Sequence, residues 1–405
     1  MEDKNIIIER MKEAELWTEA VIIASRGDTL SPENPIIATA FTAVPHANAV
    51  IISAPPYAFA VGNIAKKIPA VLDDMAQIIG PSAKVTTVAK IAKALKGRQA
   101  CLVKGLGVVA CGRTLDEAFT GTLVLEKGAK TFIECSALGG TKPINKLEAG
   151  LMHYIYKKKY SKLDQDKKMA EHAGQAVASA VDTNVGEAPC PPQDYIEERQ
   201  LIKDSGVRLI KEKLVQGTWG NISVRLDENH MLVTPSGLDY ERLTPADMVK
   251  VNINTLEYEG ELKPTSEKKL HAKILRDRSD INVVIHSHPS YCCSVASARR
   301  EMPIISDEMA RLVGGTARSA PYALPGTKKM TKGTAEALHG RNACFMSNHG
   351  VVACAPDMEG AFLTCRIMEE SAKAFIEAEA LRLTGAETYS PELIIDLFKT
   401  QAKSK

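Results

Sequence analysis

The sequence has little net charge, no long apolar run and no cysteine pair of the CxxC type. Its 51 basic and 49 acidic residues leave a formal charge of +2, so charge gives no argument for a protein that binds nucleic acid or a membrane surface. No apolar run reaches the roughly 18 residues of a membrane helix. The charged start, MEDKNIIIERMKEAELW, lacks the apolar core of a signal peptide. We therefore expect a cytoplasmic protein without a nucleic-acid or membrane partner.

What the sequence does contain is an ordinary globular composition. Hydrophobic residues make up 45% and charged residues 25% of 405 residues, which excludes a disordered chain, a collagen-like chain and a disulfide-stapled miniprotein. The nine cysteines are scattered, mostly in apolar runs, as small reduced core residues are. The length suits two domains.

An internal repeat supports the two-domain prediction. The segment Asn282–Gly314 aligns without a gap with Asn48–Gly80, at an offset of 282 − 48 = 234. A second block, Leu338–Cys354, aligns with Leu95–Cys111 at an offset of 338 − 95 = 243. Two copies are too few for a solenoid, so the repeat predicts two homologous globular domains in tandem.

The repeat also predicts where the domains lie. We expect a first repeat at residues 1–163, a linker at 164–194 and a second repeat at 195–405. The linker prediction rests on the polar, Gly- and Pro-containing stretch DQDKKMAEHAGQAVASAVDTNVGEAPCPPQD. The second repeat has a longer leader before the shared core, so the first is expected to lack its opening hairpins.

Periodicity predicts an α/β fold, in which each repeat has a mixed β-sheet flanked by helices. The short apolar runs INVVIHSH, ACFMS and GVVACA are typical of buried strands. Apolar spacing over MEGAFLTCRIMEESAKAFIEAEALRL predicts a helix with Asp357 as its N-cap, and SEKKLHAKILRDR predicts a second amphipathic helix. HMLVTPSGLDYERL predicts strand, tight turn, strand.

Three histidines of the second repeat form a candidate metal site. His286 and His288 are separated by one residue at the end of a strand, so both rings can point to the same face. His349 follows another predicted strand. Three histidines with one open position are typical of a catalytic zinc site. Alone, an HxH pair is a weak signal, and a lone histidine before glycine is often a turn residue.

Comparison of the repeats favours the metal site. At the two offsets, His286, His288 and His349 become Ile52, Ala54 and Leu106, while the surrounding residues persist. Joint loss of three histidines is what a single metal site predicts, and it makes the first repeat a non-catalytic copy.

The predicted helix SEKKLHAKILRDR contains two further candidates, Glu267 and His271. Glu267, at the start of the helix SEKKLH, could be a fourth ligand or a base. Glu33 lies opposite it in the first repeat without ligands beside it, so we interpret Glu33 as a surface or scaffold residue. His271 lies on the same helical face as Glu267, and we expect it to pack or to contact a ligand rather than bind the metal.

A second constellation consists of small polar residues in tight turns. The segments GTWGNIS, TPSG and PTSE offer backbone N–H groups and short hydroxyl side chains, which suit a phosphate. PTSE also places Thr265 and Ser266 at a helix N-terminus, where the helix dipole favours an anion. Each segment alone is ordinary turn chemistry, but their shared position before the HxH pair predicts a common pocket.

The second repeat contains five motifs in a fixed order: GN-S, TPSG, SE before a helix, HSHP and NHG. With these motifs the sequence resembles the class II aldolase/adducin family, and within it most the L-fuculose-phosphate aldolases. The resemblance covers about residues 195–383, and a degenerate form covers about 36–138. It implies that His286, His288 and His349 bind zinc, or another divalent transition metal, and that Glu267 is the catalytic acid/base. It implies a phosphate pocket formed by Asn221, Ser236, Gly237, Thr265 and Ser266.

The resemblance implies an activity and an assembly. Aldolases of this family cleave a ketose 1-phosphate to dihydroxyacetone phosphate and an aldehyde, so the expected partner is a small phosphorylated sugar. Relatives often form ring tetramers with sites between subunits. We therefore expect a homo-oligomer in which the first repeat supplies part of the ring interface, so that two chains imitate four subunits.

The sequence departs from the family pattern at one place. A tyrosine expected between Pro303 and Gly314, which would protonate the aldehyde side, is missing from IISDEMARLV. Tyr389 is a weak substitute candidate. Asp307 of this segment recurs as Asp73 in the histidine-free repeat, which favours a structural role for the aspartate. The aldehyde partner therefore stays open.

Two alternatives to the aldolase also stay open. One is another enzyme of the same superfamily, a sugar-phosphate epimerase or a dehydratase. The other is a non-enzymatic scaffold like adducin. Product analysis separates the first from the aldolase, and metal content separates the second.

Overall fold

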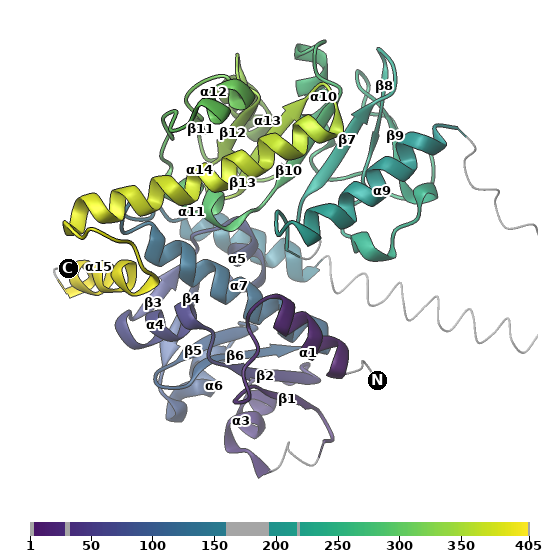
Figure 1. The fold of residues 1–405 in the computed structure, drawn as a ribbon. Helices are drawn as coiled ribbons and strands as arrows, with labels where there is room; N and C mark the ends of the chain where they lie inside the picture. The colour runs from purple at the N-terminus through teal and green to yellow at the C-terminus, as the bar shows by residue number, and fades with distance from the viewer. Residues whose placement is uncertain (1–3, 29–32, 159–193, 217–218, 404–405) are drawn as a thin grey trace, which may run out of the picture.

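The computed structural model describes residues 4–28, 33–158, 194–216 and 219–403. Figure 1 shows two sheets, one in each half of the chain, with helices around and between them. This confirms the predicted α/β architecture of two mixed sheets flanked by helices. Among the described residues, no helix is both long and apolar enough to span a membrane. The predicted linker lies outside the described residues except for Asp194, and the predicted domain boundaries stay predictions.

The described part of the first repeat contains six strands, and a helical segment at 146–158 follows them. Its elements, in chain order, are α1 (Lys4–Glu13), β1 (Ile22–Ser25), α3 (Pro35–Ala43), β2 (Ala49–Ser53), α4 (Pro56–Ile64), β3 (Lys67–Pro69), α5 (Asp73–Ile78), β4 (Ser82–Thr86), the 3-10 turn η1 (Val88–Lys90), α6 (Ile91–Leu95), β5 (Ala100–Val103), β6 (Gly107–Gly112) and α7 (Leu115–Glu134).

In the second repeat, seven strands lie within residues 194–216 and 219–403. Its elements are α9 (Ile196–Lys211), β7 (Asn221–Arg225), β8 (His230–Val233), the 3-10 turns η2 (Tyr240–Arg242) and η3 (Pro245–Asp247), β9 (Val249–Asn252), α10 (Lys268–Asp277), β10 (Val283–Ser287), α11 (Ser290–Ala298), α12 (Asp307–Val313), β11 (Ser319–Ala320), α13 (Lys328–Leu338), β12 (Ala343–Met346), β13 (Gly350–Ala355), α14 (Met358–Thr384) and α15 (Pro391–Lys403).

The two sheets share the same central topology. The strand orders are β1-β2-β6-β5-β4-β3 and β11-β12-β13-β10-β7-β8-β9. In the first sheet Ala49 pairs with Gly112 across β2 and β6, and in the second Val283 pairs with Ala355 across β10 and β13. These positions differ by 283 − 49 = 234 and 355 − 112 = 243, the offsets of the sequence repeat. The repeat therefore preserves the strand register.

The sheets differ at both edges. β1 lies beside β2 as β7 lies beside β10, but within the described residues β8 and β9 extend only the second sheet, and β3, beyond β4, extends only the first. One expectation is wrong here: HMLVTPSGLDYERL does not form two strands. β8 is its only strand, and Tyr240–Arg242 form the turn η2, while β8 pairs with β7 on one side and β9 on the other. Asp239 starts that turn by accepting a hydrogen bond from the N–H of Glu241.

Side-chain caps fix several helices. Asp357 caps α14, as predicted, by accepting from the N–H of Gly360. Two partly buried glutamates cap the start of a neighbouring helix, which is a less common form of capping. Glu126 of α7 accepts from the N–H groups of Tyr57 and Ala58 at the start of α4. Glu369 of α14 accepts from the equivalent groups at the start of α11.

The two repeats share one core rather than meeting at a polar surface. A single apolar cluster includes Leu125 and Ile133 of α7 together with Val295 of α11 and Phe362 of α14. Figure 1 shows α7 and α11 next to each other between the sheets, and α15 beside the first repeat. All eight described cysteines are buried and none forms a disulfide among them, as expected for reduced core residues.

Candidate metal centre

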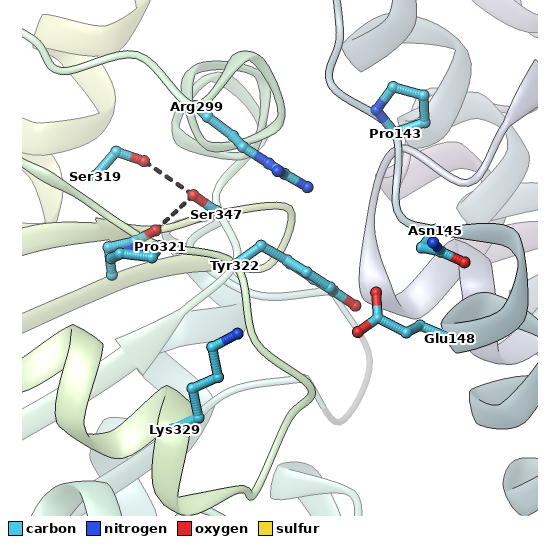
Figure 2. Close-up of a pocket in the computed structure, with 10 residues that line it drawn as sticks. Pro143, Asn145, Glu148, Arg299, Ser319, Pro321, Tyr322, Lys329 and Ser347 are labelled. Carbon is cyan, nitrogen blue, oxygen red and sulfur yellow. Dashed lines mark hydrogen bonds between the residues drawn. The ribbon is translucent and has the colours of Figure 1, made fainter.

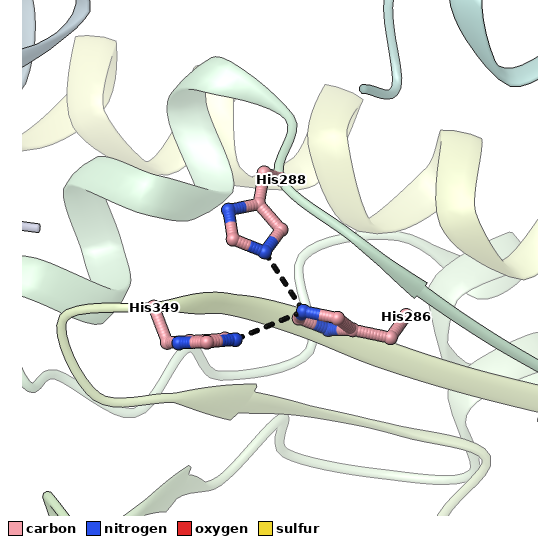
Figure 3. Close-up of side chains that lie close together, drawn as sticks. All are labelled: His286, His288 and His349. Carbon is pink, nitrogen blue, oxygen red and sulfur yellow. Dashed lines mark hydrogen bonds between the residues drawn. The ribbon is translucent and has the colours of Figure 1, made fainter. Parts of the chain in front are cut away.

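The three predicted histidines meet at one point of the second sheet. His286 lies near the end of β10, His288 follows that strand, and His349 lies in the turn between β12 and β13. Figure 3 shows the three rings converging. Gly350 permits this approach, because a Cβ there would lie 2.4 Å from the carbonyl oxygen of Ser287. Asn348 adopts a left-handed conformation with φ of 59°, which asparagine tolerates well, and so turns His349 toward β10.

The distances fit a shared ion. Nε2 of His286 lies 2.8 Å from Nε2 of His288 and 3.0 Å from Nε2 of His349. Nitrogens of a tetrahedral zinc site lie about 3.3 Å apart, given bonds of about 2.0–2.1 Å. Each ring is at most 8% exposed. Among the described residues Nδ1 of His288 has no hydrogen-bond partner. Three converging imidazole nitrogens in a buried position are a donor set that suits a divalent transition metal.

The protonation of the rings also suits a metal. Burial lowers the pKa of His286 to about 4 and lowers the pKa of His288 well below its usual value, so both rings are neutral near pH 7. Burial acts in the same direction on His349, but the carboxylates of Glu267 and Asp73 outweigh it and raise its pKa to about 10. The centre therefore attracts one positive charge, which a proton or a metal ion can supply.

Glu267 lies at the edge of this centre, as predicted. It immediately precedes α10, is 4% exposed, and places Oε1 3.0 Å from Nε2 of His349 and Oε2 3.4 Å from Nε2 of His286. Burial by itself would raise its pKa, but the electrostatic interactions with the rings of His286 and His349, together with the hydrogen bond to His349, outweigh burial and hold the pKa of Glu267 below its usual value. The carboxylate is thus charged and close enough to act on a molecule bound at the metal.

A buried polar chain holds Glu267 in place. Nδ2 of Asn221 donates to Oε2 of Glu267 over 3.3 Å. His271 lies 2.5 Å from Oδ1 of Asn221 through Nε2 and 2.6 Å from the hydroxyl of Ser223 through Nδ1. His271 therefore positions Asn221 and is outside the three-histidine cluster, in agreement with the interpretation of His271 as a packing or contact residue.

The turns predicted to bind phosphate are neighbours in the structure. Pro235 and Pro264 form an isolated β-bridge, and the N–H of Ser236 donates to the carbonyl of Lys263. This bridge brings Ser236 and Gly237 next to Thr265 and Ser266. Ser266 and Gly237 are exposed, whereas Thr265 is buried and accepts from the N–H of Glu267. Phosphate binding by these residues and Asn221 stays a prediction.

Asp73 is the residue that sequence reasoning missed. It comes from α5 of the histidine-free repeat, yet its Oδ2 lies 2.6 Å from Nδ1 of His349. The hydroxyl of Tyr322 donates to its Oδ1 over 3.1 Å, and its own N–H donates to the carbonyl of Asn348. Asp307, the repeat equivalent of Asp73, is exposed in the first turn of α12, so the two aspartates have different surroundings and a structural role for Asp307 stays a prediction.

The other sequence candidates lie elsewhere. Tyr389 is half-buried and packs on the shared core, where burial and the nearby charge of Glu134 raise its pKa beyond its ordinary range. Glu33 is exposed, in agreement with its interpretation as a surface residue. Tyr322, by contrast, brings a tyrosine hydroxyl next to the metal centre through Asp73. Only the spatial contact, across 249 residues of sequence, reveals it.

Comparison with known proteins agrees with the fold. The family model described as "Class II Aldolase and Adducin N-terminal domain" matches residues 2–133 and 200–376, which lie in the two repeats. The match spans well over half of the chain, which shows the family. The two matched ranges agree with two copies of one domain in tandem, while the predicted domain boundaries stay predictions.

Individual relatives match about half of the chain. The L-fuculose phosphate aldolase of Escherichia coli is 35% identical over 183 residues, which cover 45% of this chain and 84% of the relative. The 5-deoxy-D-ribulose 1-phosphate aldolase of Bacillus thuringiensis is 34% identical over 186 residues, covering 46% and 87%. A solved structure of an L-fuculose 1-phosphate aldolase is 32% identical, with a TM-score of 0.44, and covers 51% of this chain and 96% of that one.

Proposed function

We propose that this chain, which belongs to the class II aldolase and adducin family, is a metal-dependent aldolase that acts on a ketose 1-phosphate. The reaction yields dihydroxyacetone phosphate and an aldehyde, or joins them in reverse. One observation carries the proposal: three buried imidazoles converge, and the ionised carboxylate of Glu267 lies 3.0 Å from the Nε2 of one of them, His349. The activities named for the relatives from Escherichia coli and Bacillus thuringiensis support it.

The metal would be held by Nε2 of His286, His288 and His349, and we propose zinc. Bound there, a divalent metal supplies Lewis-acid stabilisation of the negative charge that develops when the C–C bond breaks or forms. Two of the three rings are held by protein contacts on the far nitrogen: Nδ1 of His286 lies 3.0 Å from the carbonyl of Val351, and Nδ1 of His349 lies 2.6 Å from Asp73. Such partners fix which nitrogen faces the metal.

Glu267 would move the proton. In the direction of condensation its carboxylate removes a proton from C3 of dihydroxyacetone phosphate, and that carbon then bonds to the aldehyde carbon. In cleavage the same carboxylate returns the proton to C3. The hydrogen bond from Asn221 keeps Oε2 directed into the centre, and His271 keeps Asn221 oriented. General acid–base catalysis of this kind contributes about 10²–10⁴-fold in rate.

The phosphate of the substrate would bind at the paired turns. The bridge between Pro235 and Pro264 brings Ser236, Gly237, Thr265 and Ser266 together at the start of α10. The backbone N–H groups at this helix start favour an anion. Glu267 directly follows Ser266 in the sequence. Anchoring the phosphate at these turns would therefore orient the reacting carbon toward Glu267.

One observation also favours a related reaction. Asp73 and Tyr322 bring a second carboxylate and a phenol next to His349, on the side of Nδ1. A second acid/base pair would suit a sugar-phosphate epimerase or dehydratase as well as the protonation of the aldehyde oxygen in an aldolase. The scaffold alternative is not favoured by any observation at this centre.

Product analysis tests the proposal. Metal-loaded protein is incubated with a panel of ketose 1-phosphates, and the mixture is followed by NMR. Dihydroxyacetone phosphate and an equimolar aldehyde are expected. An epimeric sugar phosphate or a dehydrated product, with no dihydroxyacetone phosphate, would replace the aldolase with the alternative enzyme. No metal and no product would favour the scaffold.

A further inference from the structure

The structure contains a polar cavity of about 650 Å3 where the two repeats meet. The first repeat and the helical segment that follows it contribute Asn145 and Glu148. The second repeat contributes Arg299, Tyr322, Lys329 and Ser347. Figure 2 shows these side chains directed toward the cavity from both sides. The cavity exists only because the repeats pack against each other, so neither repeat could form it by itself.

This cavity adjoins the metal centre. A smaller cavity, which His349 lines, shares Ser347, Ala320 and Pro321 with it. The hydroxyl of Tyr322, which lines the larger cavity, donates to Asp73, the carboxylate that holds His349. The larger cavity is therefore next to the third metal ligand. The turns predicted to bind the 1-phosphate, at Ser236 and Ser266, do not line it.

The charges of the lining favour an anion. Arg299 and Lys329 outnumber Glu148, which leaves one positive charge in excess. Arg299 is held in position, because its Nε donates to Oδ1 of Asn348 over 2.9 Å and its guanidinium lies 5.2 Å from the ring centroid of Tyr322. A fixed guanidinium together with a flexible ammonium suits a phosphate or a carboxylate. The hydroxyls of Ser347 and Tyr322 donate to the carbonyl of Ala320 and to Asp73, so their oxygens would accept hydrogen bonds from the hydroxyl groups of a small sugar.

We propose that this cavity is the aldehyde subsite, and that it selects aldehydes that carry an anionic group. The inference rests on the proposed aldolase function. In the condensation, C3 of dihydroxyacetone phosphate loses its proton to Glu267 and bonds to the aldehyde carbon, the aldehyde oxygen takes up a proton to become a hydroxyl, and the anionic group stays unchanged at the far end of the product. Arg299 and Lys329 bind that end.

Paired aldehydes test the inference. Condensation with dihydroxyacetone phosphate is measured for glyceraldehyde 3-phosphate against glyceraldehyde, and for glyoxylate against glycolaldehyde. The wild-type protein is expected to prefer at least one anionic partner by about tenfold or more in kcat/KM. A preference in the first pair identifies a phosphate, and a preference in the second a carboxylate. Equal or lower kcat/KM for both anionic partners would overturn the inference.

Substitutions of the two cationic side chains test whether they cause the preference for an anionic aldehyde. Lys329→Met is expected to reduce the ratio of kcat/KM for the anionic over the neutral aldehyde by about tenfold, and Arg299→Gln by at least as much. Lys328→Met is the matched control, because Lys328 is the preceding lysine of the same helix and does not line the cavity. An unchanged ratio in Lys329→Met would overturn the inference even if Arg299→Gln does not fold.

The proposed function is tested separately in the same samples. Exchange of the C3 proton of dihydroxyacetone phosphate in heavy water needs no aldehyde. Exchange without an anionic preference would overturn only the assignment of the cavity. Absence of exchange in metal-loaded protein would overturn the aldolase, and the subsite with it.

Discussion

The carboxylate of Asp73 lies 2.6 Å from Nδ1 of His349, although 276 residues separate them in the sequence. The repeat that lost all three histidines thus contacts the one that kept them. A carboxylate that accepts from Nδ1 leaves Nε2 of the ring to face the metal. The second carboxylate oxygen accepts from Tyr322, so Asp73 is itself held in one orientation.

The first prediction concerns this contact. Asp73→Asn is expected to weaken metal binding by about 10–100-fold, because the amide holds the His349 ring less firmly than the carboxylate. A metal titration against a competing chelator measures the loss. Asp307→Asn is the matched control, since Asp307 is the repeat equivalent of Asp73 (73 + 234 = 307) and is exposed. Equal metal affinity in wild type and Asp73→Asn would refute the orienting role.

The second prediction concerns the ligands. His286→Ala and His349→Ala are expected to lower the bound metal from about one ion per chain to almost none, because two imidazoles hold the ion too weakly. Elemental analysis of the purified protein measures the content, and circular dichroism checks the fold. His230→Ala, at a partly exposed position next to Asp227, is expected to keep its metal. Full metal content in either ligand variant would exclude that residue as a ligand.

The third prediction separates the base from the ligands. Glu267→Gln is expected to keep most of the metal while losing about 10²–10⁴-fold in kcat, because the amide cannot accept the proton. Glu33→Gln, at the equivalent position of the first repeat (33 + 234 = 267), is expected to be fully active. Turnover in Glu267→Gln at the wild-type rate would show that another group moves the proton.

The fourth prediction concerns the pH dependence of stability. Burial raises the pKa of Glu126 to about 7, despite its hydrogen bonds from two backbone N–H groups, and burial also raises the pKa of Glu369. Between the unfolded value near 4.5 and the folded value the native state binds more protons. The free energy of unfolding therefore falls as pH rises through this window, by at most about 1.4 kcal/mol per pH unit for each group.

Denaturant titrations at pH 5 and pH 8 check this slope. Glu126→Gln is expected to lose less stability than wild type between the two values, because a neutral side chain does not titrate. Glu370→Gln, which changes an exposed acid on α14, is expected to keep the wild-type slope. Identical slopes in wild type and Glu126→Gln would mean that this glutamate is not the titrating group.

Much of the site was predictable because its signals are local. The HxH pair, the NHG turn and the glutamate before α10 are each short motifs, and the tandem repeat supplied an internal comparison in which the histidines vanish together. The register of β2 with β6 and of β10 with β13 follows the repeat offsets, so the sheet cores were predictable as well.

What escaped prediction depends on contacts between the repeats. Asp73 and Tyr322 become site residues only when α5 packs beside the turn of His349, and no local pattern encodes that packing. The recurrence of Asp73 and Asp307 was visible but did not reveal this contact, because equivalent positions in two packed repeats face different neighbours. The wrong strand at Tyr240–Arg242 has a local cause, since the cap by Asp239 and the burial of Tyr240 favour a turn.

The most direct test of the central claim is proton exchange at C3 of dihydroxyacetone phosphate in heavy water, followed by NMR with and without a chelator. The account predicts exchange by the metal-loaded protein, its loss on chelation and its return when zinc is added. A metal-loaded, folded protein that leaves the C3 proton in place would contradict the account.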